Sequence, residues 1–221
     1  LEFTDYVVGN KDLIAAVPFP VNPGDLNVAP EKVNVTFKHL LAKVVFEITK
    51  SGGTAEDYVA VDPFNFTAKK QGDCLVHFGQ KVDETSAAAT FATAYVTDPH
   101  IHWNVDDVTT RYDIFPLENG DKKTWSDGTV RQEFYVLPQS NVGLKLSDFK
   151  IYIQDAEGRV TKSYIMDDVS LEIPRHTKWL PGQIYRYYAT VTPGSYNIEF
   201  SASVDAWHDT ANRDHNISPN K

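Results

Sequence analysis

The 221-residue sequence has little of several features that define common protein classes. It contains one cysteine, Cys74, so it can form neither an intrachain disulfide framework nor a zinc site made of several thiolates. No apolar run approaches the roughly 20 residues that a membrane-spanning helix needs. Basic residues number 21 against 30 acidic ones, without a Lys/Arg cluster, and the net charge is −9. This balance argues against binding to nucleic acid or to an anionic membrane surface.

A sustained 3.6-residue apolar stripe, the pattern of an amphipathic helix, is also missing. Short runs rich in Val, Ile, Tyr, Phe and Thr follow one another instead, separated by turn sequences such as Pro193-Gly194. The runs that we expect to be strands are 33–37, 44–48, 58–61, 74–78, 90–96, 132–137, 149–153, 164–166, 184–191 and 197–204. Strands at this spacing without intervening helices predict an all-β fold, an antiparallel β-sandwich.

The strongest hairpin prediction covers residues 183–204. Apolar residues alternate with polar ones on both arms around Pro193-Gly194. The residues expected on the core face are Tyr185, Tyr187, Ala189 and Val191 on the first arm and Ile198, Phe200, Ala202 and Val204 on the second. We therefore expect both Tyr187 and Phe200 to be buried.

Two segments look irregular, residues 1–30 with four prolines and residues 98–130 with many Asp, Asn and Gly. A long loop on a β scaffold can carry binding function. Trp103 and Trp125 lie in the second segment and are candidate ligand-binding residues, because exposed aromatic rings can stack on sugars. A carbohydrate-binding module is therefore one functional alternative.

The sequence offers few candidates for chemistry. His100 and His102 share one face if this segment is a strand, and a carboxylate nearby could complete a metal site, but two ligands do not make one. Cys74 and His77 should face opposite sides of a strand, so we expect a buried structural thiol rather than a nucleophile. No nucleophile motif or phosphate-binding loop is present. We expect no catalytic residue, no metal and no cofactor, although whether a metal binds near His100 and His102 stays open.

A succession of local patterns resembles the fimbrillin-like family, the pilus subunits of Bacteroidota. The resemblance runs from about residue 12 to residue 207. The segments that carry it are Asp12-Leu13-Ile14-Ala15-Ala16, the alternating strand from Val33 to Phe37 with His39 and Lys43 after it, Phe134-Tyr135-Val136-Leu137-Pro138-Gln139, Trp179-Leu180-Pro181-Gly182-Gln183-Ile184-Tyr185-Arg186-Tyr187, and Asp205-Ala206-Trp207. The family resemblance implies structural roles for Phe37, His39, Pro138, Trp179, Gly182, Tyr185 and Trp207, which we call the motif residues.

The resemblance implies a transthyretin-like β-sandwich, export as a lipoprotein precursor and a place in a fimbrium at the outer membrane. Family members assemble by β-strand addition, in which an open groove accepts a strand of the next subunit. The implied partners are therefore other fimbrial subunits, with a surface glycan or protein as an adhesion ligand and no nucleic acid. The chain starts at Leu1, so we expect that a leader has been removed.

The sequence departs from the family pattern at both ends. Only about 11 residues precede Asp12, where the family has a whole first domain. The chain is therefore expected to be either a fragment or a subunit with a reduced N-terminal domain. We expect residues 1–30 to be a leading strand and linker, the remnant of such a domain in the second case, residues 31–213 to be the main sandwich, and residues 214–221 to be a polar tail. The stretch from His208 to Ile217 does not alternate and makes a poor donor strand. A tip or accessory subunit is therefore favoured over a stalk subunit.

Overall fold

The computed structural model describes residues 1–16, 37–77 and 100–207, and these residues form strands and turns without a helix. Accordingly, no helix among them could cross a membrane. The strands are β1 (Glu2–Val7), β2 (Ile14–Ala16), β3 (Phe37–His39), β4 (Ala42–Lys50), β5 (Tyr58–Val61), β6 (Phe64–Lys69), β7 (Gln71–His77), β8 (His100–Val105), β9 (Thr109–Ile114), β10 (Lys123–Trp125), β11 (Thr129–Val136), β12 (Lys145–Gln154), β13 (Val160–Ser170), β14 (Gln183–Val191) and β15 (Glu199–Ala206). The all-β prediction is confirmed.

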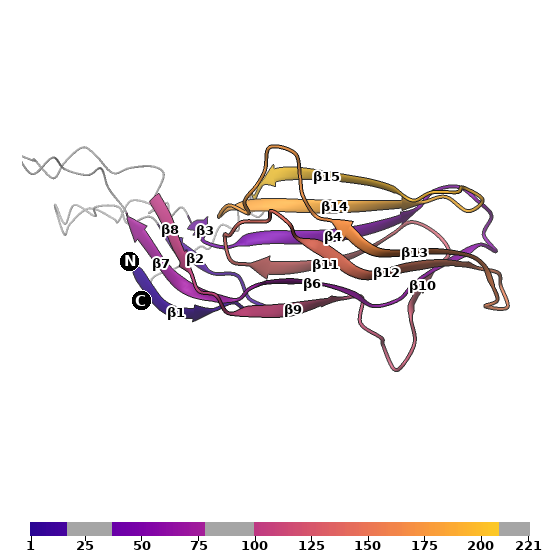
Figure 1. Cartoon of the computed structure of the whole chain (residues 1–221), viewed down its shortest axis with the longest axis horizontal. Coiled ribbons are helices and arrows are strands. Elements are labelled where there is room, and N and C mark those ends of the chain that lie inside the picture. The colour runs from indigo at the N-terminus through magenta and orange to yellow at the C-terminus, as the bar shows by residue number, and fades with distance from the viewer. Residues whose placement is uncertain (17–36, 78–99, 208–221) are drawn as a thin grey trace, which may run out of the picture.

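Two sheets form the main body, which we call the sandwich (Figure 1). The first sheet has the order β11-β4-β14-β15 and is antiparallel except for the central pair, β4 and β14, which is parallel. In the second sheet, β12 pairs with β13 along one edge and with β5 and β6, end to end, along the other. Strands β10 and β9 then extend this sheet beyond β5 and β6.

Aromatic side chains from both sheets fill the space between them. Phe46 of β4 stacks on Tyr187 of β14, with ring centroids 5.5 Å apart, and contacts Phe64 and Phe66 of β6 at 6.1 and 5.5 Å. All four side chains are buried. Tilted and edge-on ring pairs of this kind add to the stabilisation that burial gives. This core joins the two sheets into one unit.

A further sheet, outside the two sheets of the sandwich, has three strands in the order β1-β7-β8. We call it the small sheet. β7 begins two residues after β6 ends, and β8 ends four residues before β9 begins, so the small sheet continues from the sandwich edge (Figure 1). Its own core, the small core, is separate from the sandwich core. It contains the buried residues Ala15, Leu40, Cys74 and Val76, with Phe3, Leu13, Ile101 and Trp103 packed against them.

Most of the predicted strands are found, usually a few residues longer than expected. The predicted strand 90–96 and nearly all of 33–37 lie outside the described residues. Two predictions were wrong: β6 was missed, and the segment 98–130 is not an irregular loop, because it contains β8, β9 and β10. In β8 the alternation is present as His-Ile-His-Trp-Asn-Val, but its outward residues are His and Asn, which also occur in loops.

The hairpin prediction is confirmed on β14 and only partly on β15. The four core-face residues predicted on β14 are all buried. Tyr187 pairs with Ala202 and Ala189 with Phe200, so these residues share one face, as expected. Phe200, however, is 43% exposed, so the prediction that it is buried was wrong. The reason is its position: β15 pairs only with β14 and forms the outer edge of the sheet, where the facing sheet covers it incompletely.

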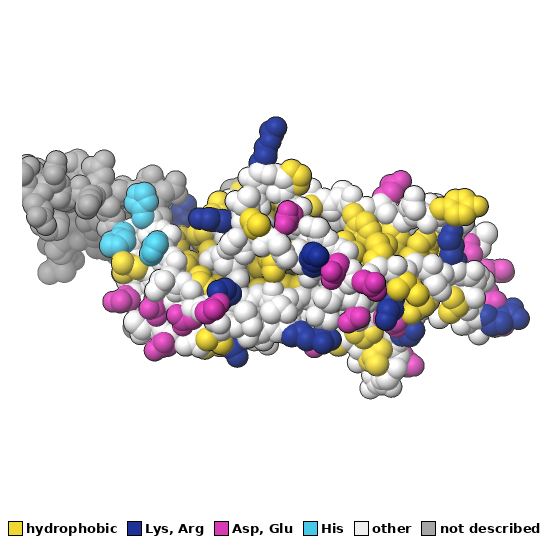
Figure 2. All heavy atoms as spheres, in the orientation of Figure 1, with side chains coloured by type: hydrophobic (Ala, Val, Ile, Leu, Met, Phe, Trp, Pro, Cys, Tyr) yellow, Lys and Arg dark blue, Asp and Glu magenta, His cyan; other side chains and the backbone are white. Residues whose placement is uncertain are grey.

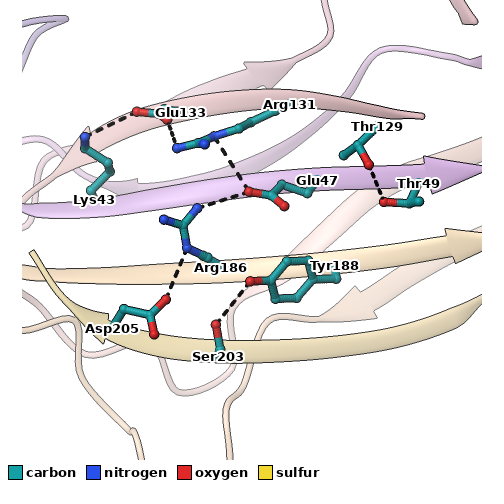
Figure 3. A network of polar contacts seen from close by, with 10 residues as sticks. All are labelled: Lys43, Glu47, Thr49, Thr129, Arg131, Glu133, Arg186, Tyr188, Ser203 and Asp205. Atoms are coloured by element: carbon teal, nitrogen blue, oxygen red, sulfur yellow. Dashed lines mark hydrogen bonds and ion pairs between the residues drawn. The ribbon is translucent and has the colours of Figure 1, made fainter. Parts of the chain in front are cut away.

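Charged side chains alternate in sign across the outer face of the first sheet (Figure 3). Glu47 on β4 lies between Arg131 on β11 and Arg186 on β14, at 3.7 and 3.0 Å from Glu47 Oε1. The row continues from Arg131 to Glu133 and from Arg186 to Asp205. The outer pairs of the row are exposed and contribute little stability each, whereas Glu47 and Arg186 are partly buried. Lys43 adds a third cation, 3.3 Å from Glu133, so the row contains three cations and three carboxylates that compensate one another.

Candidate assembly site

The N-terminal strand β1 closes one edge of the small sheet by pairing antiparallel with β7. The backbone amide of Val76 donates to the carbonyl oxygen of Leu1 at 2.8 Å, and that of Val8 donates to the carbonyl of Lys70, also at 2.8 Å. Phe3 lies opposite Cys74, and Tyr6 lies opposite Gly72. β1 therefore satisfies backbone groups of β7 that would otherwise face solvent as an open edge.

The apolar side chains of the N-terminal segment sit against the small core. Phe3 and Leu13 pack directly on its buried members, and Tyr6 meets the ring of Trp103 edge-on, with centroids 5.8 Å apart. Val8 is half-buried. The N-terminal segment therefore covers the small core.

The pairing between β1 and β7 is interrupted in its middle. The register shifts between Phe3 and Tyr6, and Asp5 has a φ of 50°, in the left-handed region that costs a non-glycine residue free energy. The Asp5 backbone amide donates to the side chain of Asp73 at 2.9 Å instead of continuing the ladder. A strand of similar side chains without this bulge could make more backbone hydrogen bonds to β7 than β1 does.

Several motif residues meet where the small sheet joins the sandwich, which we call the junction. The ring of His39 stacks on Trp207, with centroids 3.7 Å apart and planes 7° from parallel. Lys43 Nζ lies 4.2 Å from the centroid of the Trp207 ring, and Asp12 Oδ2 lies 2.5 Å from His39 Nδ1. These contacts connect the N-terminal segment, the start of β4 and the end of β15.

Backbone hydrogen bonds at Gly182 hold the same junction together. The Gly182 amide donates to the carbonyl of Leu41 at 2.9 Å, and the Trp207 amide donates to the carbonyl of Gly182 at 2.8 Å. Gly182 has a φ of 68°, a conformation that glycine adopts without the penalty of a Cβ atom. The motif glycine therefore aligns β14 with the chain entering β4 and with the end of β15.

The remaining motif residues are Phe37, Pro138, Trp179 and Tyr185, and their environments differ. Trp179 is fully buried, and the hydroxyl of Tyr185 donates to the carbonyl of Lys178 at 2.9 Å. After Pro138, the side-chain amide of Gln139 accepts from the backbone amide of Lys69 at 2.9 Å and donates to its carbonyl at 3.0 Å. Phe37, at the start of β3, is 55% exposed. Of the seven motif residues, His39, Gly182 and Trp207 thus lie at the junction.

The two tryptophans predicted to bind a ligand are not brought together. Trp103, on β8, is half-buried beside the small core and donates its indole N–H to the carbonyl of Leu40 at 2.8 Å. Trp125, on β10, is half-buried and packs on the sandwich core. Each ring is thus partly covered by a hydrophobic core. Ligand binding by these residues stays a prediction.

Cys74 lies in the small core, so the accessibility of its thiol indicates whether this core is intact. Its side chain is fully buried, and burial raises the pKa of the thiol to about 11. Its partner residues are Phe3 on β1 and Trp103 on β8. The predicted burial of Cys74 is confirmed, and His77 faces outward on the opposite side of the strand, as expected.

We expect the reaction of Cys74 with a thiol-specific reagent to be slow at neutral pH and to speed up as the pH approaches 11. The folded pKa is raised, so this group stabilises the fold fully below the ordinary thiol pKa of about 9 and loses that contribution as the pH rises through 11. Stopped-flow labelling between pH 7 and pH 11 measures this profile. A labelling profile centred near pH 9 in the folded chain would contradict it.

The fimbrillin-like family profile matches residues 3–207. Among solved structures, a candidate cell adhesion protein of Bacteroides uniformis superposes with a TM-score of 0.50 at 18% identity, over 94% of this chain and 66% of that one. A fimbrial protein of Bacteroides vulgatus has a TM-score of 0.38 and 14% identity, over 79% of this chain and 56% of that one. The chain therefore spans between half and two thirds of these structures, and no curated protein sequence matches it. Since the family profile covers nearly the whole sequence, the chain belongs to the fimbrillin-like family.

Proposed function

We propose that the protein is a structural subunit of a cell-surface fimbria and joins other fimbrial subunits by β-strand exchange at the small sheet. Fimbrillin-like proteins are structural rather than enzymatic, so the chain is not an enzyme. The proposal includes export as a lipoprotein precursor to the outer membrane and a role in adhesion. The polar sequence after Trp207, which lies outside the described residues, favours a tip or accessory position over a stalk position.

The observation that carries this proposal is the way in which β1 pairs with β7 and packs on the small core. It is an edge strand, its ladder is broken at Asp5, and its apolar side chains cover a small core that the rest of the chain builds. Removal of β1 would expose both the backbone of β7 and the pocket that Phe3 fills. An incoming strand with apolar residues at alternate positions supplies what such an edge lacks, namely backbone hydrogen bonds and side chains for the pocket.

The test is a variant that lacks residues 1–8. We expect Cys74, now uncovered on the β1 side, to react at least about tenfold faster with a thiol reagent, because its burial depends on Phe3. The far-UV circular dichroism should keep its β character, because the sandwich core contains no residue of the deleted segment. A synthetic peptide of residues 1–8 should bind one to one and restore the slow labelling.

The matched control is the same peptide with Phe3 and Tyr6 replaced by serine, which keeps the backbone donors and acceptors but cannot fill the small core. A full-length fimbrial subunit from the same cells, added to the shortened chain, should form a larger complex by light scattering. If the shortened chain keeps Cys74 protected, or binds neither peptide nor subunit, strand exchange at β7 is wrong.

A further inference from the structure

The register of the small sheet places three histidines on one outward face. His77 of β7 lies directly opposite His100 of β8, and Leu75 lies opposite His102. Opposite residues of an antiparallel pair share a face, as do residues two apart on one strand. All three histidines are exposed, whereas their strand neighbours Cys74 and Val76 face the small core. Figure 2 shows histidine side chains gathered at this end of the molecule.

Such an arrangement has the dimensions of a three-imidazole metal site. Directly opposite Cβ atoms lie about 4.5–5.5 Å apart and diagonal ones about 7–8 Å. Residues two apart along a strand are separated by roughly 6.6 Å. A triangle with sides of about 5–8 Å allows three rings to converge on one ion at metal–nitrogen distances of about 2.0–2.1 Å. The pair on β8 and the residue across from it therefore meet the spacing requirement.

Within residues 1–16, 37–77 and 100–207, no three His, Cys, Asp or Glu side chains surround a common point as they stand. Convergence of the three rings thus requires rotation about their side-chain bonds. Exposed side chains exchange between staggered rotamers within picoseconds to nanoseconds, so such rotation is readily available to these three rings. Glu2 of β1, which is exposed and lies opposite Leu75, adds a negative charge to the same face.

We propose that His77, His100 and His102 form a binding site for a divalent transition metal of the class that imidazole prefers, such as Zn²⁺, Ni²⁺ or Cu²⁺. The ion is held by ligands from both strands, so it fastens β7 to β8 at the end of the small sheet where residues 78–99 connect them. Three protein ligands leave a further coordination position for water or for a ligand from another molecule. This inference does not depend on the proposed function.

Isothermal titration of the full chain with ZnCl₂ tests the proposal. We expect one ion per chain, and at least about tenfold weaker binding for each of the variants His77→Ala, His100→Ala and His102→Ala. Loss of a direct ligand should weaken binding at least as much as the 10–100-fold typical for loss of its supporting partner. Zinc should also raise the melting temperature and slow the labelling of Cys74 in the unsubstituted chain, since it stabilises the small sheet.

The control variants remove histidines elsewhere, His176→Ala in a turn of the sandwich and His208→Ala with His215→Ala in the C-terminal tail, and should bind zinc as the original chain does. Melting temperatures measured without metal should be the same for all variants, because the rings at positions 77, 100 and 102 are exposed. The proposal is overturned if no saturable binding occurs. It is equally overturned if the double variant His77→Ala/His100→Ala binds zinc as tightly as the original chain.

Discussion

Replacement of Trp179 by alanine is expected to lower the free energy of unfolding by about 3–5 kcal/mol, the range for a large buried aromatic. Trp179 has no exposed surface, and its ring meets Phe66 edge-on at 6.0 Å. Its indole N–H donates to the hydroxyl of Tyr187 at 3.2 Å. The substitution therefore leaves a cavity between the sheets and removes the donor for a buried hydroxyl. Urea denaturation followed by circular dichroism measures the change.

Two further variants separate the contribution of the hydrogen bond between Trp179 and Tyr187 from that of burying an aromatic ring. Tyr187→Phe keeps the packed ring but leaves the Trp179 indole N–H without its acceptor, which should cost about 1–3 kcal/mol. Phe200→Ala removes a ring similar in size to that of Tyr187, but from the edge strand β15. It should cost less than about 1.5 kcal/mol, because Phe200 is only partly removed from water. If Trp179→Ala costs no more than Phe200→Ala, the sandwich core does not depend on the motif tryptophan as described.

Gly72→Ala is expected to disrupt the small sheet with a cost of about 3 kcal/mol, the upper part of the range for overpacking. A Cβ atom at this position would lie 2.5 Å from the carbonyl oxygen of Asn104 and 2.9 Å from the Cα atom of Val105. Both are backbone atoms of β8, so no side-chain rotation relieves the clash. Gly72 also faces Tyr6 of β1, and β7 therefore cannot shift without disturbing both neighbours.

The matched control for this substitution is Gly9→Ala, because a Cβ atom at Gly9 would meet nothing within 4 Å. We expect Gly72→Ala to accelerate the labelling of Cys74, two residues along β7, and Gly9→Ala to leave it unchanged. The sandwich core should keep its β circular dichroism in both variants, since it contains no residue of β7. Slow labelling of Cys74 in the Gly72→Ala chain would show that the close approach of β7 and β8 is not required.

Period-2 alternation predicted strands well where the outward residues were ordinary strand formers. The β14 arm from Tyr185 to Val191 was predicted with the correct faces because one side is uniformly apolar. β6 was missed although Phe64 and Phe66 alternate with polar residues, and one of these, Asn65, is itself buried. The exposure of Phe200 could not be predicted, since an edge strand and a central strand have the same alternation and differ only in how much of the facing sheet covers them.

The candidate site was partly visible in the sequence. The family motif identified His39 and Trp207, but only the fold brings these two residues, far apart in the sequence, into a stacked pair. The pairing of His77 with His100 could not be foreseen either, because it depends on the register between β7 and β8, which 22 intervening residues separate. Sequence spacing finds ligands within one strand, as for His100 and His102, and misses those across strands.

The parallel pair at the centre of the first sheet has a consequence for the time course of folding. β4 and β14 are aligned from Lys43 with Ile184 to Lys50 with Val191, so the middle of the sandwich joins early and late parts of the chain. Closing so long a loop costs conformational entropy before the contacts between β4 and β14 can compensate for it. Folds dominated by contacts between distant parts of the sequence therefore form slowly. During synthesis β4 is made long before β14, and until β14 has been made β4 can pair only with β11. The first sheet is therefore incomplete during that part of synthesis, because β15 reaches it only through β14.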